Sequence, residues 1–406
     1  MTPSATLQPR WQRLQRRALL VGLVAAGLCV LGYLVHPVQF FRSYLVAYLF
    51  WLGVAMGCLA ILMLHYLVGG RWGIVIRRVL EAGTRLLPLM LVLGTPLIFG
   101  IPALYVWAPG ATVSAQGLQA LPGGVVEPGM SPLQQVYLRV PFFLGRAGVY
   151  FVVWLVLAFF LNRWSRQQEQ EPDPLVIRTR QRRLGMVSGG GLVLYGLTMT
   201  FAAVDWMMSL EPQWFSTVYG FLVLIGQVLV AMAFAILVTF WLAQDEPYAA
   251  VASPALWRDL GNLLLACVML WAYIAFSQLL ITWSGDLPEE IRWYLHRSHG
   301  GWNWVGVVLA GVHFAVPFCL LLSRRVTRRA PALATVAAVL FGFHLVDVFW
   351  LVMPAFSPGR LRVHWLDIVA PIAVGGLWLA TFLWQLQRRS LLPWYEPSLQ
   401  EAMPHG

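Results

Sequence analysis

Residues 332–353 read ALATVAAVLFGFHLVDVFWLVM, an apolar run that decides the fold class. About 20 apolar residues in a helix cross the roughly 30 Å hydrocarbon core of a lipid bilayer. The run is therefore predicted to be a membrane-spanning helix. It nevertheless contains His344 and Asp347, which are three residues apart and so lie on one face of a helix.

The same composition extends over the whole chain. Of its 406 residues 59% are hydrophobic and only 11% are charged, whereas soluble proteins carry about a quarter charged residues. No apolar run alternates with a period of two, so a β-barrel is not expected, and helices satisfy their own backbone polar groups in lipid. We predict a single all-α transmembrane domain over 1–406 with about ten transmembrane helices. The predicted spans are 18–36, 44–68, 86–107, 139–162, 185–206, 215–242, 260–282, 302–322, 332–353 and 365–386.

The distribution of arginine predicts the orientation of these spans. All 28 basic residues are arginine; 21 lie in segments on the N-terminal side of the membrane, six lie on the opposite side, and Arg146 falls inside a span. The positive-inside rule then places both termini in the cytoplasm, including the basic N-terminus at 1–17. The net charge of +11 is interpreted as anchoring beside anionic lipids rather than as nucleic-acid binding.

The cysteines give no sign of a bound redox group. Cys29, Cys58, Cys267 and Cys319 all fall within predicted helices, and none belongs to a CxxC or CxxCH motif. We therefore expect neither a covalent haem nor an iron–sulfur cluster in this chain.

Several polar residues are predicted near the middle of the membrane. At about 1.5 Å of rise per residue, His313 and His344 reach the bilayer centre and Asp347 lies roughly a turn farther out. Gln227 lies at a similar depth. Because a charged group at the centre costs at least about 2.5–3.5 kcal/mol, we expect these four residues to cluster. The cluster suits a proton relay or a hydrogen-bonded pin between helices, whereas no ligand spacing calls for a metal, and we expect none.

A second polar group is predicted nearer the outer face. Arg146 lies about two turns into its helix, Asp205 ends the fifth predicted span, and Glu211 lies in the turn that follows. A guanidinium group cannot discharge and therefore needs a carboxylate partner. We expect Arg146 to meet Asp205 or Glu211, and a structural ion pair is favoured over a ligand-binding role.

Five segments resemble a known membrane protein family, the smaller of the two ten-helix subunits of alternative complex III. That bacterial complex is a quinol:electron-acceptor oxidoreductase, and the resemblance covers roughly residues 40 to 402. The VDWMMSLEPQWFSTVYG segment is the most specific. The segments are PFFLGRAGVYFVVW (141–154), VDWMMSLEPQWFSTVYG (204–220), GGWNWVGVVLAGVHFAVPFCLLLSR (300–324), VDVFWLVMP (346–354) and LPWYEPSLQEA (392–402).

The resemblance implies an architecture and a set of partners. The family fold is similar to polysulfide reductase-like (NrfD-like) membrane subunits, with two four-helix bundles plus two further helices. The bundles would cover 44–206 and 215–353, with a last helix and cytoplasmic tail at 365–406. Haem c and iron–sulfur clusters are expected in periplasmic partner subunits, and quinol oxidation in the sister ten-helix subunit.

The expected function is that of a cofactor-free subunit in the respiratory chain of the bacterial inner membrane, where it supports the sister subunit and conducts protons. It would not be catalytic alone. A terminal oxidase is a candidate partner, and the loops at 209–213 and 285–301 would dock periplasmic partners. The proton-path candidates are His313, His344, Asp347 and Gln227, with Asp205, Glu211 and Arg146 at the outer end.

Two other functions remain open. The chain could itself bind quinol in an aromatic pocket, with His313 or Asp347 as the proton acceptor. It could also be an independent ion-coupled transporter with broken helices around a midplane site, although no inverted repeat is visible.

Overall fold

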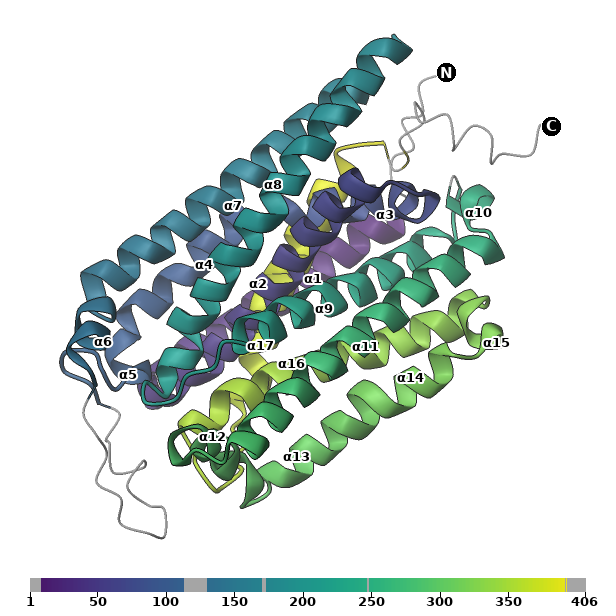
Figure 1. The fold of residues 1–406 in the computed structure, drawn as a ribbon. Helices are drawn as coiled ribbons and strands as arrows, with labels where there is room; N and C mark the ends of the chain where they lie inside the picture. The colour runs from purple at the N-terminus through teal and green to yellow at the C-terminus, as the bar shows by residue number, and fades with distance from the viewer. Residues whose placement is uncertain (1–8, 113–129, 170–172, 247, 391, 393–406) are drawn as a thin grey trace.

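The computed structural model describes residues 9–112, 130–169, 173–246, 248–390 and 392. Within these residues the regular structure is entirely helical, and ten helices are long and apolar enough to cross a membrane. The long helices run side by side in Figure 1. The predicted all-α, multi-span membrane fold is therefore confirmed.

The helices follow one another along the chain with short connections. In order they are α1 (Pro9–Val35), α2 (Pro37–Val68), α3 (Arg71–Thr84), α4 (Leu87–Phe99), α5 (Ile101–Leu104), α6 (Pro132–Tyr137), α7 (Val140–Glu169), α8 (Pro174–Trp206), α9 (Tyr219–Leu242), α10 (Tyr248–Val251), α11 (Pro254–Gly285), α12 (Pro288–Ser298), α13 (Trp302–Val308), η3 (Leu309–Ala315), α14 (Val316–Leu321), α15 (Arg324–Thr327), α16 (Ala330–Val352) and α17 (Leu366–Gln387). The short turns η2 (Met208–Leu210) and η4 (Met353–Ala355) follow α8 and α16.

Helix α2 is the centre of the first bundle. Its most apolar window is buried along its whole length, as expected for a helix that is hydrophobic on all sides. It packs against α3, α4 and α8, and α7 closes the bundle against α4 and α8. We call this group of helices the first bundle.

The second bundle contains α9, α11, α16 and the broken helix formed by α13, η3 and α14. Helix α9 joins it to the first bundle by packing against α2. A Cβ atom at Gly57 of α2 would lie 2.0 Å from the backbone oxygen of Gln227 on α9, so the two backbones touch. Small residues permit this close approach between membrane helices.

Helices α1 and α17 are the two additional helices. They pack along each other, and a Cβ atom at Gly376 would lie 2.4 Å from the Cα atom of Gly22. Gln387 donates a hydrogen bond to Gln15 at 3.1 Å, so α17 ends at the same end of the bundle where α1 begins. We call this end the inner end and the opposite one the outer end.

The third membrane span differs from its predicted form. The sequence places the span at 86–107 after an arginine-rich segment outside the membrane, but the span covers Arg71–Phe99 and includes α3 as well as α4. Arg77 and Arg78 on α3 are buried and paired with Glu81. Because these charges interrupt the apolar pattern, the predicted span began after them.

Candidate functional site

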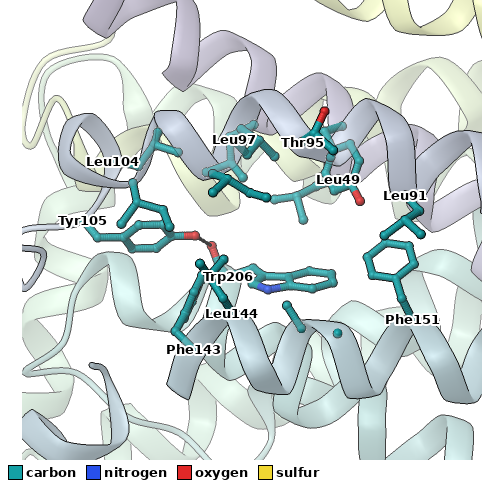
Figure 2. Close-up of a pocket in the computed structure, with 17 residues that line it drawn as sticks. Leu49, Leu91, Thr95, Leu97, Leu104, Tyr105, Phe143, Leu144, Phe151 and Trp206 are labelled. Carbon is teal, nitrogen blue, oxygen red and sulfur yellow. Dashed lines mark hydrogen bonds between the residues drawn. The ribbon is translucent and has the colours of Figure 1, made fainter. Parts of the chain in front are cut away.

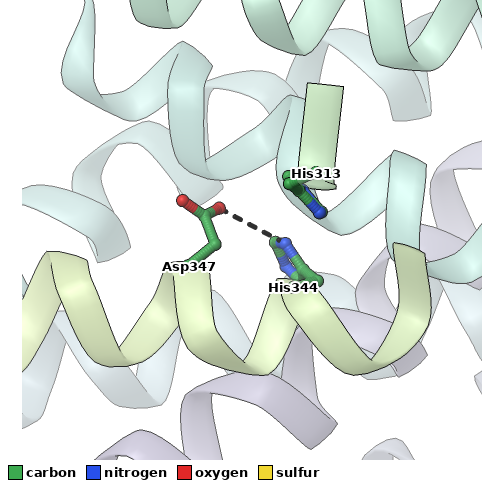
Figure 3. Close-up of side chains that lie close together, drawn as sticks. All are labelled: His313, His344 and Asp347. Atoms are coloured by element: carbon green, nitrogen blue, oxygen red, sulfur yellow. Dashed lines mark ion pairs between the residues drawn. The ribbon is translucent and has the colours of Figure 1, made fainter. Parts of the chain in front are cut away.

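The second bundle brings His313, His344 and Asp347 together in its interior (Figure 3). The Nδ1 atom of His344 lies 3.4 Å from Oδ2 of Asp347, and the imidazole rings of His313 and His344 are stacked with centroids 5.9 Å apart. All three side chains are buried. We call these residues the central cluster. The sequence prediction that they would meet inside the membrane agrees with this geometry.

His313 lies in an unusual piece of backbone. Residues Leu309–Ala315 form a π-helical turn between α13 and α14. Such turns are rare and occur frequently at functional sites. Both ring nitrogens of His313 are buried and have no hydrogen-bond partner among the described residues. A buried polar atom in this state is costly, so the ring is positioned for an exchangeable partner such as water or a proton.

Trp271 on α11 fixes the carboxylate of the cluster. Its Nε1 donates to Oδ2 of Asp347 at 3.3 Å, and its ring meets His313 edge-on with centroids 4.6 Å apart. The sequence prediction did not include Trp271, because a tryptophan in an apolar helix is ordinary. The sequence contained one indication that Trp271 could reach the cluster: it lies near the middle of the predicted span 260–282, as the cluster residues do in their own spans.

Gln227 borders the central cluster without touching it. Its Oε1 accepts a hydrogen bond from Tyr195 at 2.9 Å. With His344 and Asp347 it lines a cavity of about 20 Å³, and a single water needs roughly 10–15 Å³. The structure therefore connects Gln227 to the cluster through a space the size of one water molecule.

Arg146 and Asp205 form a pair in the first bundle. The Nε and Nη2 atoms of Arg146 donate to the two carboxylate oxygens of Asp205 at 2.9 and 2.8 Å. Tyr150 donates to the same carboxylate at 2.7 Å. This bidentate geometry is the strong form of an ion pair, and it joins α7 to α8. The predicted pairing of Arg146 with Asp205 is present, whereas the alternative pairing with Glu211 is not.

Glu211 instead belongs to a separate cluster with α12. Its Oε2 lies 2.8 Å from Nδ1 of His296, and its Oε1 accepts from Nη1 of Arg297 at 3.2 Å. All three residues are buried. The segment 285–301 is therefore not simply an exposed loop, because one face of α12 is fixed against the turn after α8. Burial alone would raise the pKa of Glu211, but Arg297 and His296 outweigh it and hold that pKa below its usual range.

Tyr219, the first residue of α9, packs beside the Glu211 cluster. Its ring meets Trp214 and Trp293 edge-on, with centroids 5.2 and 6.2 Å apart. Trp293 lies on α12, the helix that also carries His296 and Arg297.

A buried ionic cluster at the inner end was missed by the sequence prediction. Glu81 is paired with Arg77 at 3.1 Å, with Arg78 at 2.7 Å and with Arg389 at 3.0 Å, and Ser165 donates to it. These contacts join α3, α7 and the end of α17. The signal was a glutamate placed three and four residues after two arginines, which is the spacing of helical ion pairs.

The central cluster is also the group of described residues whose spacing could hold a metal ion, since its potential ligand atoms all lie within 4.8 Å of one another. Charge favours a proton. One proton neutralises the single carboxylate, whereas a divalent cation would leave a net positive charge inside the membrane, where charges are costly.

The fold and the central cluster define an all-α, multi-span membrane protein with a buried pair of histidines and an aspartate in its second bundle. In comparisons with known proteins, the chain matches no family model and no curated protein sequence.

Proposed function

We propose that this chain conducts protons through its second helix bundle as a membrane subunit of a quinol-oxidising respiratory complex. The observation that carries the proposal is the central cluster, which borders a cavity the size of one water molecule within a membrane-spanning bundle. The assignment to a complex of the alternative complex III type is supported by the segments that resemble that family. The bacterial inner membrane is the location that follows from it.

The chemistry of the central cluster suits proton transfer. Histidine takes up and releases protons near neutral pH, and it can accept a proton on one ring nitrogen while the other releases one. Nδ1 of His344 lies 3.4 Å from Asp347 without a direct hydrogen bond, and a proton held on His344 would neutralise the cluster as an ion pair with this carboxylate. His313 stacks on His344 and has ring nitrogens without other partners, so it can receive the proton next.

An outward route follows from the neighbouring residues. The small cavity connects His344 and Asp347 to Gln227, and Tyr219 at the start of α9 packs against Trp293 of α12, the helix that carries His296 and Arg297. Ordered water can bridge polar groups that are too far apart for direct hydrogen bonds. The proposed exit is the Glu211 cluster at the outer end. The Arg146–Asp205 pair lies in the other bundle, and its bidentate contact gives it the character of a structural clamp.

The remaining parts of the reaction are assigned to partner subunits. The sequence offers no CxxC or CxxCH motif, so haem c and iron–sulfur clusters are proposed in periplasmic partners and quinol oxidation in the sister membrane subunit. In this proposal the chain is not catalytic alone, and it supports the sister subunit in the membrane. A terminal oxidase stays a candidate electron acceptor.

Quinol oxidation within this chain is less well supported. The cavity beside His344 and Asp347 is about 20 Å³, far smaller than the roughly 300–1,000 Å³ of sites that bind small organic molecules. A larger apolar pocket of about 260 Å³ lies in the first bundle (Figure 2). Its 17 lining residues include no histidine and no carboxylate to accept a quinol proton.

The proposal is tested with the assembled complex in sealed vesicles. Replacing His344 by Phe keeps a ring in place but removes both titratable nitrogens, and we expect proton transfer per quinol oxidised to fall. The matched control is His36→Phe, because His36 is exposed between α1 and α2 and lies outside the proposed path. Copurification with haem- and iron–sulfur-containing subunits checks that the complex assembles. Unchanged proton transfer in an assembled His344→Phe complex would contradict the relay.

A further inference from the structure

A long apolar groove runs along the first bundle between α4 and α7, with α2 as its floor. Figure 2 shows aromatic rings at both ends of the hollow, Tyr105 and Phe143 at one and Phe151 at the other. On α4 the lining residues extend from Leu91 to Ile98, and Ile101 continues the wall on α5. Leu91 and Ile101 are ten positions apart, which corresponds to a rise of about 15 Å along a helix, or half of the hydrocarbon core.

Pro96 lies inside α4 beside the groove, and two of the wall positions are glycine. Proline has no N–H, so the carbonyl of Val92 loses its usual helical partner. The hydroxyl of Thr95 replaces it by donating to that carbonyl at 2.7 Å. Gly94 on α4 and Gly148 on α7 contribute no side chain to the space between the helices.

The chemistry of the lining selects a hydrocarbon ligand. Among the lining residues the hydroxyl of Thr95 donates to a backbone carbonyl, and so does that of Tyr105, which reaches the carbonyl of Trp206 at 3.1 Å. The remaining side-chain donors of the lining are the hydroxyl of Tyr48 and the indole N–H of Trp206, and two neutral donors without a charged side chain do not form a phospholipid head-group site. The other lining atoms offer mainly aliphatic and aromatic surface, which gains free energy by covering an apolar chain.

The groove is continuous with the lipid-facing surface of the protein. Leu91 and Ile98 line the groove and are also 41% and 46% exposed, so they form its open edge. A hydrocarbon chain can therefore enter sideways from the bilayer without crossing a polar layer. We propose that this groove binds one acyl chain of a membrane phospholipid, which fills the gap between α4 and α7.

This inference is independent of the proposed proton path and is tested by filling the groove. Leucine at Gly148 would occupy the space, since a Cβ atom there meets no other atom within 4 Å. Gly145 provides the matched control: it is on the same helix and is equally open, but it does not line the groove. The complex is purified in mild detergent, and bound lipid is measured by native mass spectrometry followed by extraction.

We expect the wild type and Gly145→Leu to retain one phospholipid more per chain than Gly148→Leu. A phospholipid with a photoreactive group on its acyl chain should also crosslink to α4 or α7 in the wild type, and this crosslinking should fall several-fold in Gly148→Leu. Equal retention and equal crosslinking in all three proteins would overturn the proposal. Recovery of an isoprenoid quinone or of a partner helix from the groove would overturn it as well.

Discussion

Arg146 and Asp205 hold α7 and α8 together through two parallel hydrogen bonds of 2.9 and 2.8 Å, with the carboxylate fully buried. Removing one member of such a pair leaves the other charge buried without compensation, which typically costs about 3–5 kcal/mol. We therefore predict that Asp205→Asn lowers the thermal unfolding temperature of the detergent-solubilised protein substantially. Differential scanning fluorimetry measures this change.

The comparison for this pair is Asp259→Asn. Asp259 lies 3.6 Å from Arg258, and both side chains are nearly half exposed, so this contact is worth at most about 1 kcal/mol. Equal losses in the two variants would mean that the Arg146–Asp205 contact is not a structural clamp. If Asp205→Asn instead lost proton transfer without losing stability, Asp205 would be a member of the proton path and not a structural clamp.

Glu211 should make stability depend on pH in acid. Arg297 and His296 contact its carboxylate and outweigh the effect of burial, so its pKa is lowered in the folded protein. A carboxyl group with a lowered folded pKa stabilises the protein above its ordinary pKa of about 4.3, and this contribution is lost as the pH falls through the folded value. We predict that Glu211→Gln is less stable than the wild type at pH 7 and that the difference narrows in acid.

The measurement is the unfolding temperature of both proteins between pH 7 and pH 3. Curves that stay parallel over this range would show that Glu211 does not contribute through its charge. Glu289→Gln serves as the control, because Glu289 is exposed on the same α12 helix and should give no such convergence.

The hydrogen bond from Trp271 should matter for the central cluster. Trp271→Phe keeps an aromatic ring but removes the N–H group that donates to Asp347 at 3.3 Å. Loss of a hydrogen bond to a charged group costs about 1.5–3 kcal/mol, so we expect reduced stability and slower proton transfer. Trp283→Phe, on the same helix but 72% exposed, should change neither quantity. Proton transfer at the wild-type rate in Trp271→Phe would remove Trp271 from the functional site.

Hydropathy predicted the ten spans because each one keeps a long apolar stretch whatever its neighbours are. Depth along the helix predicted that His313, His344 and Asp347 would meet, since residues at one depth in adjacent helices can touch. The pairing of Glu211 with His296 and Arg297 could not be predicted this way. It depends on how a surface helix folds back over a turn 85 residues away, which no periodicity encodes.

Two further features near buried charges depend on tertiary contacts. The π-helical turn that carries His313 packs against α11 and α16, and Pro317 follows it two residues after its end. Arg77 and Arg78 read as surface charges until Glu81, Ser165 and Arg389 are seen to surround them. Tertiary contacts therefore determine which charges are exposed, whereas the hydropathy pattern determines where the helices lie.

Gly226 on α9 gives the sharpest test of how the central cluster is positioned. A Cβ atom at this position would lie 2.7 Å from Cε1 of His344, so Gly226→Ala must push the imidazole away from α9. Overpacking of this kind costs about 1–3 kcal/mol, and it would also change the 3.4 Å spacing between His344 and Asp347. We predict slower proton transfer and a lower unfolding temperature in Gly226→Ala.

The matched control is Gly342→Ala on α16, two residues before His344, where a Cβ atom meets nothing within 4 Å. Alanine favours helix over glycine by about 1 kcal/mol, so this variant should be at least as stable as the wild type and equally active. Normal proton transfer in Gly226→Ala, with the protein folded and assembled, would show that the position of the His344 ring is not critical. The central cluster would then be a structural contact between η3 and α16 rather than a proton path.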